Sequence, residues 1–171
     1  GADTIGHKAA QDVNGQTICV MPSGLDRPFP PENKALWEDL LTYSGAVFVS
    51  EFSFGTAAST LTLRKRNKTI VSFAVGVLVS QSSKTGGAMN AFRFALEQRK
   101  PIATFCEDGN NDTLGNAFIG EVVSSPNTDM LIPPPSISRN STRHRNVTRF
   151  VSTESNLEAY ARWLQACSLP I

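Results

Sequence analysis

Cysteine and histidine are scarce in this sequence and widely spaced. The three cysteines, Cys19, Cys106 and Cys167, contain no CxxC pair, so neither a metal site nor a disulfide framework is predicted. His7 and His144 are far apart, and neither lies in a cluster of Cys, Asp or Glu with metal-ligand spacing. We therefore expect no metal and no other cofactor, and thiols that suit a reducing cytosol.

Long apolar runs and a surplus of charge of one sign are absent as well. No run approaches the roughly 20 residues of a membrane span, and no signal peptide is visible, so we expect a cytoplasmic protein without a membrane partner. The net charge is +1, so a nucleic-acid surface would have to be a local one. No Ser/His/Asp or Cys/His arrangement has catalytic spacing, and we expect no enzyme activity.

Apolar strands and amphipathic helices alternate along the 171 residues. The strands are predicted at 16–21, 46–49, 75–79 and 101–105. The helices are predicted at 3–12, 32–43, 61–72, 88–98, 114–119 and 154–167. Asp3 or Thr4 is expected to cap the first helix, and Asn14-Gly15 to end it.

The predicted strands are continuous apolar runs, which is typical of a parallel sheet buried on both faces. We therefore predict a three-layer α/β domain with a mainly parallel sheet. Ligands of such sheets bind beyond the carboxyl ends of the strands, and the four loops there are expected to meet on one rim. Ser23, Gly24 and Glu51 lie on that rim and are secondary candidates for ligand contact.

The loop at 80–87 reads SQSSKTGG and leads into a helix. Its glycines let backbone amides approach a ligand, its hydroxyls can donate hydrogen bonds, and its lysine adds charge, which together predict a phosphate site. The candidate residues are Ser83, Lys84, Thr85, Gly86 and Gly87. The motif is neither a P-loop nor GxGxxG, and an ordinary strand-to-helix turn remains the alternative.

A basic run, Arg64 to Lys68, precedes this strand and loop. Arg66, Asn67 and Lys68 are candidate phosphate contacts that would position a nucleic-acid strand. The run could equally be a solvated helix face, with Arg66 and Asn67 turned inward to brace the site. Glu51 could act as a general base or bind a ribose hydroxyl, but a structural role, such as a helix cap or a pair with Arg66, is favoured.

Residues 121–171 are predicted to be a proline-containing spacer, a basic segment and a final helix that packs on a domain formed by 1–120. Within the basic segment, Arg143 and Arg145 are candidates for a second nucleic-acid contact or for a partner-binding strand. A charged surface hairpin or arm is the alternative. Trp37 and Trp163 both have helical core spacing and are interpreted as packing residues.

Four stretches together resemble the DNA processing protein A family, also called DprA or Smf. GADTIGHKAA is similar to the family's GxDxxAH, with Asp3 and His7 in place. TICVMPSGLDRPFPPENKAL is similar to TIAVxxxGLDxxYPxxNxxL, with Phe29 for the tyrosine. SGAVFVSEFSFGT is similar to GxxxSExPxGT, and LRKRNKTIVSFAVGVLVSQSSKTGGAMNA to the following RNR and SGS segments.

The resemblance covers residues 1 to about 120 and implies an extended Rossmann-like fold. It also implies sequence-independent binding of single-stranded DNA, a homodimer, and hand-off of DNA to a RecA-type recombinase during natural transformation. The family's first strand and its GSR loop do not precede Gly1, so we expect the chain to be incomplete at its N-terminus.

Two other functions remain open. The same strand-end pocket could bind a nucleotide or a nucleotide-derived small molecule, as a sensor or a hydrolase with Glu51 as the acid. A related hydrolase motif, PGGxGTxxE, has a glutamate after its glycines, whereas Gly86-Gly87 is followed by AMNAFRFA. Alternatively, the basic segment and the final helix could form a partner-binding module.

Overall fold

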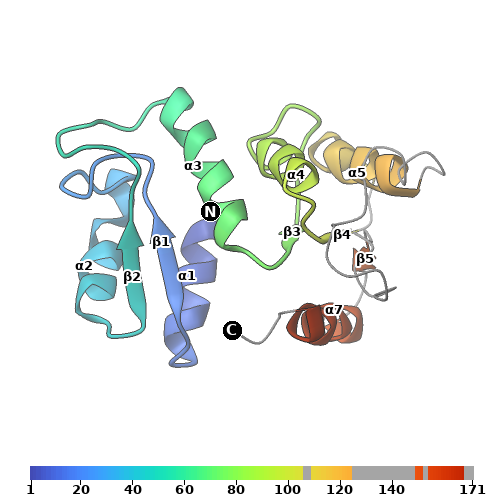
Figure 1. Ribbon diagram of the computed structural model, residues 1–171, viewed down its shortest axis with the longest axis horizontal. Coiled ribbons are helices and arrows are strands. Elements are labelled where there is room, and N and C mark those ends of the chain that lie inside the picture. Colours follow the sequence, from blue (N-terminus) through green and yellow to red (C-terminus); the bar gives the residue numbers. More distant parts are fainter. Residues whose placement is uncertain (106–108, 125–148, 152–153, 168–171) are drawn as a thin grey trace, which may run out of the picture. The chain divides into compact units, whose positions relative to one another are not determined.

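The computed structural model describes residues 1–105, 109–124, 149–151 and 154–167. The chain forms two compact units, residues 1–69 and 70–171, each described by itself below (Figure 1). Helix α3, Thr60–Phe73, begins in the first unit and ends in the second.

The first unit is a two-stranded parallel sheet with helices packed on it. Its elements are α1 (Ala2–Asp12), β1 (Thr17–Val20), η1 (Pro31–Asn33), α2 (Lys34–Thr42), β2 (Ala46–Val49) and most of α3. The register runs from Thr17 opposite Ala46 to Val20 opposite Val49. The core consists of Cys19, Met21, Leu36, Trp37 and Leu40.

The ends of α1 show one correct and one wrong prediction. Asn14 has a φ of 52° and the Gly15 amide donates to the Ala10 carbonyl at 2.7 Å, so Asn14-Gly15 ends the helix as predicted. The predicted cap is wrong, because Gly1 is the N-cap residue and Asp3 lies inside the first turn.

The second unit is a three-stranded parallel sheet in the order β3-β4-β5. Its elements are the end of α3, β3 (Val77–Val79), α4 (Ala88–Glu97), β4 (Ile102–Phe105), η2 (Asn111–Thr113), α5 (Leu114–Ser124), β5 (Arg149–Val151) and α7 (Glu154–Cys167). The core consists of Val71, Val79, Met89, Phe92, Ala95, Ile102 and Ile119. A smaller cluster joins Ala103 to Tyr160 of α7.

Helical spacing in the sequence predicts that Leu41 and Phe73 face inward and that the helix beginning at residue 114 ends at residue 119; all three predictions need correction. Leu41 is 68% exposed because it lies about 100° around α2 from Leu40, beyond the stripe that faces the core. Phe73, the last residue of α3, is 56% exposed rather than inward. The helix predicted to end at residue 119 continues to Ser124, since the apolar pattern persists through the glycine at 120.

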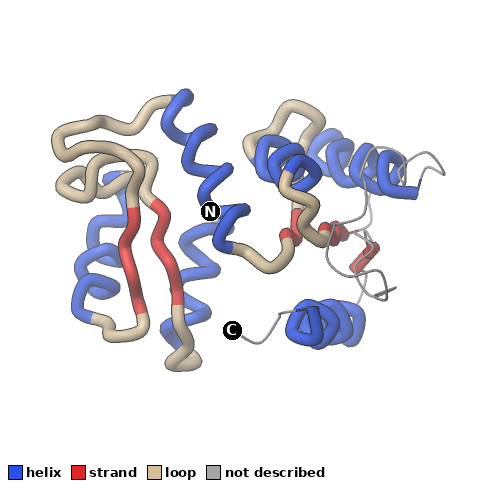
Figure 2. Tube along the Cα trace, in the orientation of Figure 1, coloured by secondary structure: helices blue, strands red, loops and turns tan. Residues whose placement is uncertain are grey.

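The α/β class with parallel strands flanked by helices is confirmed in each unit (Figure 2). The strands form one sheet per unit, so the ends of β1 and β2 meet in the first unit and those of β3 and β4 in the second. A single rim shared by all four loops, and a domain boundary near residue 120, stay predictions. None of the described helices is long and apolar enough to cross a membrane.

Candidate functional site

A buried asparagine holds the loop at 80–87 in the second unit. Asn116 of α5 is fully buried; its Oδ1 accepts from the Ser82 amide at 2.9 Å and its Nδ2 donates to the Ser80 carbonyl at 3.0 Å. The Gly115 amide donates to the Ser82 carbonyl at 2.7 Å. The first half of the loop is therefore fixed to α5 by its backbone.

The second half of the loop presents polar side chains at the start of α4. Lys84 and Thr85 are exposed and Ser83 is half-buried. Gly87 is the N-cap of α4, with no side-chain cap, while the Met89 amide already donates to the Gly86 carbonyl. Lys84 thus lies three residues before the N-cap of α4, and the dipole at a helix N-terminus favours an anion.

The glycines around this loop differ in what they are needed for. A Cβ on Gly115 would lie 2.4 Å from the Ser82 carbonyl oxygen, and one on Gly86 would lie 2.5 Å from Ser82 Oγ. Gly87 has a helical φ of −58°, and a Cβ there would meet nothing within 4 Å. Packing explains Gly86 and Gly115 but gives no reason for glycine at 87.

The basic run lies on the part of α3 that belongs to the first unit. Arg64, Lys65 and Lys68 are exposed, as the helical pattern predicts, and Asn67 is half-buried. Arg66 turns inward: its Nη1 is 3.2 Å from Asp3 Oδ2 and 3.4 Å from the Val20 carbonyl oxygen. Arg66 thus turns inward, as one of the two alternatives expected, and it joins α1 to the end of β1. A brace to the loop at 80–87 and a phosphate contact both stay predictions.

The secondary candidates also lie in the first unit. Glu51 is exposed, and the pairing with Arg66 is wrong because Asp3 is that arginine's partner. Ser23 is fully buried; its Oγ donates to the Arg27 carbonyl at 2.5 Å and its own carbonyl accepts from Ser50 Oγ at 2.7 Å.

A Cβ on Gly24 would lie 2.6 Å from the Ser53 carbonyl oxygen, so the loops after β1 and β2 pack together there. Ser23 and Gly24 thus have structural partners, and a ligand contact for them stays a prediction. Arg143 and Arg145 lie outside the described residues.

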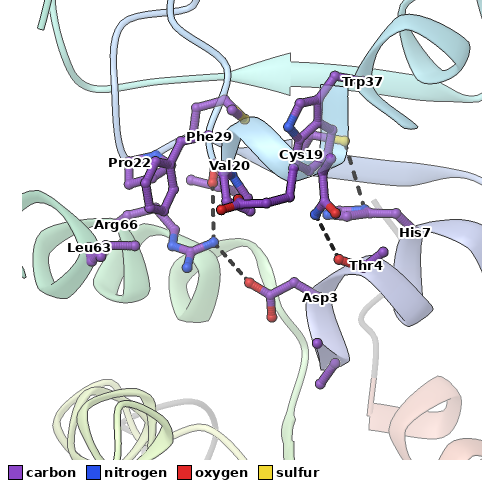
Figure 3. A pocket seen from close by; sticks show the side chains of 16 residues that line it. Asp3, Thr4, His7, Cys19, Val20, Pro22, Phe29, Trp37, Leu63 and Arg66 are labelled. Carbon is purple, nitrogen blue, oxygen red and sulfur yellow. Dashed lines mark hydrogen bonds and ion pairs between the residues drawn. The ribbon is translucent and has the colours of Figure 1, made fainter. Parts of the chain in front are cut away.

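A cavity of about 460 Å³ in the first unit was not predicted from the sequence (Figure 3). Its lining residues are Gly1, Ala2, Asp3, Thr4, His7, Cys19, Val20, Met21, Pro22, Phe29, Pro30, Glu32, Asn33, Trp37, Leu63 and Arg66. The available signal was the GxDxxAH-like segment, which supplies Asp3 and His7 to one wall. Its other walls come from segments whose approach only the fold determines.

The ionisable groups beside β1 are kept neutral by burial. Burial lowers the pKa of His7, the nearby Asp3 carboxylate opposes that shift, and Arg66 adds to it. Burial raises the pKa of the Cys19 thiol to about 11. His7 Nδ1 lies 2.7 Å from Thr17 Oγ1 and 3.8 Å from Cys19 Sγ. No group of three metal-ligating side chains occurs among the residues described.

Comparisons with known proteins agree with the motif resemblance. The family model described as DNA recombination-mediator protein A matches residues 1–118. Protein Smf of Escherichia coli is 35% identical over 102 residues, which are 60% of this chain and 27% of that protein. DNA processing protein DprA of Streptococcus pneumoniae is 30% identical over 102 residues, 60% of this chain and 36% of that protein. The chain thus spans only about a third of these relatives.

Solved structures show the same fold. The X-ray structure of Streptococcus pneumoniae DprA superposes with a TM-score of 0.68 at 21% identity, covering 93% of this chain and 47% of that one. DNA processing protein A from Helicobacter pylori, whose structure concerns a single-stranded DNA binding mode, gives a TM-score of 0.54 at 22% identity, over 61% of this chain and 48% of that one. Since the family model covers more than half of the chain, this chain belongs to the DNA recombination-mediator protein A family.

Proposed function

We propose that this chain binds single-stranded DNA without sequence preference and catalyses no reaction on it. Family membership supports the proposal, as does the single-stranded DNA binding attributed to the Helicobacter pylori protein of the same fold. Phosphate contacts carry no sequence information, so binding through them is indifferent to sequence.

The loop at 80–87 is the observation that carries the proposal. Asn116 fixes the first half of the loop and α4 begins at Ala88, so the segment with Lys84 and Thr85 is held at both ends. Holding both ends lowers the cost of ordering these side chains on a ligand. Gly87 leaves open space at the start of α4, where a phosphate oxygen can approach the backbone closely. A helix N-terminus together with a lysine binds a phosphate without needing a specific base.

The exposed cations of α3 supply the second set of contacts. Lys68, Arg64 and Lys65 are exposed on the helix. Arg66 pairs with Asp3 and holds the helix in place. We assign Lys68 and Lys84 to phosphate, and Asn67 to a polar contact beside it. Arg66 would contribute by keeping this part of α3 oriented.

The test compares two double variants that remove the same charge. Lys68→Ala with Lys84→Ala removes one proposed contact in each unit. Lys34→Ala with Arg162→Ala is the control, since both residues are exposed and each pairs with a glutamate four residues away on its own helix, Glu38 and Glu158 respectively. Fluorescence anisotropy with oligo-dT is measured at two salt concentrations.

The first double variant should bind more weakly, and its salt dependence should be flatter. The slope of log K against log salt is negative, and each lost phosphate contact reduces its magnitude by about 0.7 for single-stranded DNA. The control should retain most of the slope. An unchanged slope in the Lys68/Lys84 variant would rule out these residues as phosphate contacts.

Family membership also supports two finer proposals: that the protein acts as a homodimer, and that it passes the strand to a RecA-type recombinase. Sedimentation equilibrium tests the first, and a monomer at micromolar concentration with DNA present would contradict it. Stimulation of recombinase loading on oligo-dT tests the second, and no stimulation by a chain that still binds DNA would contradict it.

A further inference from the structure

Two residues that line the cavity of the first unit, Trp37 and Arg66, each have a buried hydrogen-bond donor without an acceptor. Trp37 is 5% exposed, and its Nε1 has no hydrogen-bond partner among the described residues; the same holds for Arg66 Nε. Figure 3 shows the indole nitrogen on the side of the ring nearer Val20 and Phe29, which also line the cavity. Because an unpaired buried donor is costly, the cavity suits a ligand that offers acceptor atoms.

The charges in the cavity do not suit a phosphate group. The Arg66 guanidinium is already bonded to Asp3 Oδ2 at 3.2 Å, and Glu32 adds a second carboxylate to the lining. His7 is kept neutral by burial, which lowers its pKa. Two carboxylates against one arginine repel an anion, but they accept hydrogen bonds from donor groups on a neutral ligand.

The walls of the cavity suit a flat ring. Trp37 and Phe29 line it with Met21 and Pro22, and the His7 ring stands edge-on to Trp37 with centroids 5.8 Å apart. Aromatic side chains pack well against planar ligands. The volume of a small-molecule site is usually about 300–1,000 Å³. The cavity, at about 460 Å³, has room for one ring system with its substituents.

We propose that this cavity binds an uncharged heteroaromatic ring that carries both acceptor and donor groups, which is the chemistry of a nucleobase. The ring comes either from a free nucleoside or from an unstacked base of a bound strand. Only the second source rests on the function proposed above. Trp37 donates to a ring acceptor, and the carboxylate of Asp3 or Glu32 accepts from a ring amino or imino group.

The indole N–H resonance of Trp37 gives a direct test in the intact chain. Trp37→Phe keeps an aromatic ring but removes the donor, so the resonance that disappears in this variant is that of Trp37. Adenosine, guanosine, cytidine and thymidine are titrated into the wild type, and the shift of that resonance is followed. At least one nucleoside should move it and should bind about three- to tenfold more weakly to Trp37→Phe, as loss of one hydrogen bond predicts.

Tyr43→Phe is the matched control. Its hydroxyl donates to the Gly15 carbonyl at 2.7 Å in the same unit, and Tyr43 does not line the cavity. This variant should bind nucleosides as the wild type does. If it weakened binding as much as Trp37→Phe, the effect would be a loss of stability and the site would be rejected.

Titrations with oligonucleotides distinguish a base of a bound DNA strand from a free nucleoside as the source of the ring. If oligo-dT moves the Trp37 resonance and an abasic oligonucleotide of equal length does not, the base comes from the strand. If only nucleosides move it, the ligand is the free molecule. The proposal is overturned if neither moves it, if the abasic strand moves it equally, or if a nucleoside monophosphate binds tenfold more tightly than its nucleoside. If anisotropy shows that oligo-dT binds but neither oligo-dT nor any nucleoside shifts the Trp37 resonance, this site is rejected and the proposed function is unaffected.

Discussion

His7 joins helix α1 to strand β1. Its Nδ1 lies 2.7 Å from Thr17 Oγ1 and 3.8 Å from the sulfur of Cys19, and its ring packs edge-on against Trp37. Burial disfavours the imidazolium form, so the ring makes these contacts as a neutral group. Cys19 is 1% exposed and has a pKa of about 11, so it remains a protonated thiol at neutral pH. This contact therefore depends on the protonation state of a single ring.

The His7 environment predicts acid sensitivity. The pKa of His7 is lowered from 6.5 in the folded state, so below that pH the unfolded chain binds more protons than the folded one. The free energy of unfolding should therefore fall as pH drops from 7.5 toward 5. His7→Gln should lose this component while carboxylate titrations remain. Urea unfolding at both pH values measures the difference, and an equal drop in the variant would contradict the assignment.

At the scale of elements, α5 positions the loop that precedes α4. Two neighbouring residues at its start act together: Gly115 allows close approach to the Ser82 carbonyl, and Asn116 bonds the loop backbone. Asn116 Nδ2 also reaches the Phe105 carbonyl at 3.3 Å, which ties the end of β4 to the same point. The candidate phosphate loop thus takes its shape from a helix more than twenty-five residues further along the chain.

Alanine substitutions at Gly115 and Gly87 should have different effects, with Gly115→Ala lowering stability and Gly87→Ala lowering DNA affinity. Gly115→Ala places a Cβ 2.4 Å from backbone oxygen and should destabilise the protein by about 1–3 kcal/mol. Gly87→Ala fits the helical backbone and open space, so stability should be unchanged or higher by about 0.4–1 kcal/mol.

Gly87→Ala should nevertheless weaken oligo-dT binding, because its methyl group occupies the approach to the start of α4. Thermal unfolding and anisotropy on the same samples measure both effects. Wild-type affinity in a stable Gly87→Ala protein would mean that no ligand approaches the backbone there.

At the scale of the whole molecule, the described C-terminal helix belongs to the core of the second unit. Tyr160 of α7 is 3% exposed, and its hydroxyl donates to the Val77 carbonyl at 3.2 Å. A Cβ on Gly76 would lie 2.6 Å from Leu164 Cδ2. The family model ends at residue 118, so α7 adds packing beyond the matched region.

Substitutions at Tyr160 test this contribution. Tyr160→Phe removes the hydroxyl that donates to the carbonyls of Val77 and Pro101 and should lower the free energy of unfolding by about 0.5–1.5 kcal/mol. Tyr160→Ala also empties the contact with Ala103 and should cost about 3–5 kcal/mol. Guanidinium unfolding followed by circular dichroism measures both. Equal stability of Tyr160→Ala and the wild type would show that α7 does not stabilise the fold.

Local pattern predicted most of the elements, because β2 is a continuous apolar run and helices such as α7 are periodic, but it did not predict β5 (Arg149–Val151). It failed for Leu41 and Phe73, which are exposed. Both lie at the edge of the apolar face of their helix, where spacing alone does not decide whether a side chain is buried. It left Arg66 with two orientations, because the choice depends on Asp3, sixty-three residues away. Asn116 and the cavity were missed since both arise from long-range contacts that no local spacing encodes.

Asn116 has a practical consequence for anyone who wishes to re-engineer this protein. Its hydrogen bonds are to the main chain at Ser80 and Ser82, so they constrain where that backbone runs but not which side chains it carries outward. A combinatorial library would therefore keep Asn116 and Gly115 constant and randomise Lys84 and Thr85, whose side chains are exposed. Ligand preference could then be reprogrammed on an unchanged scaffold, with each clone judged by selection for a new anion.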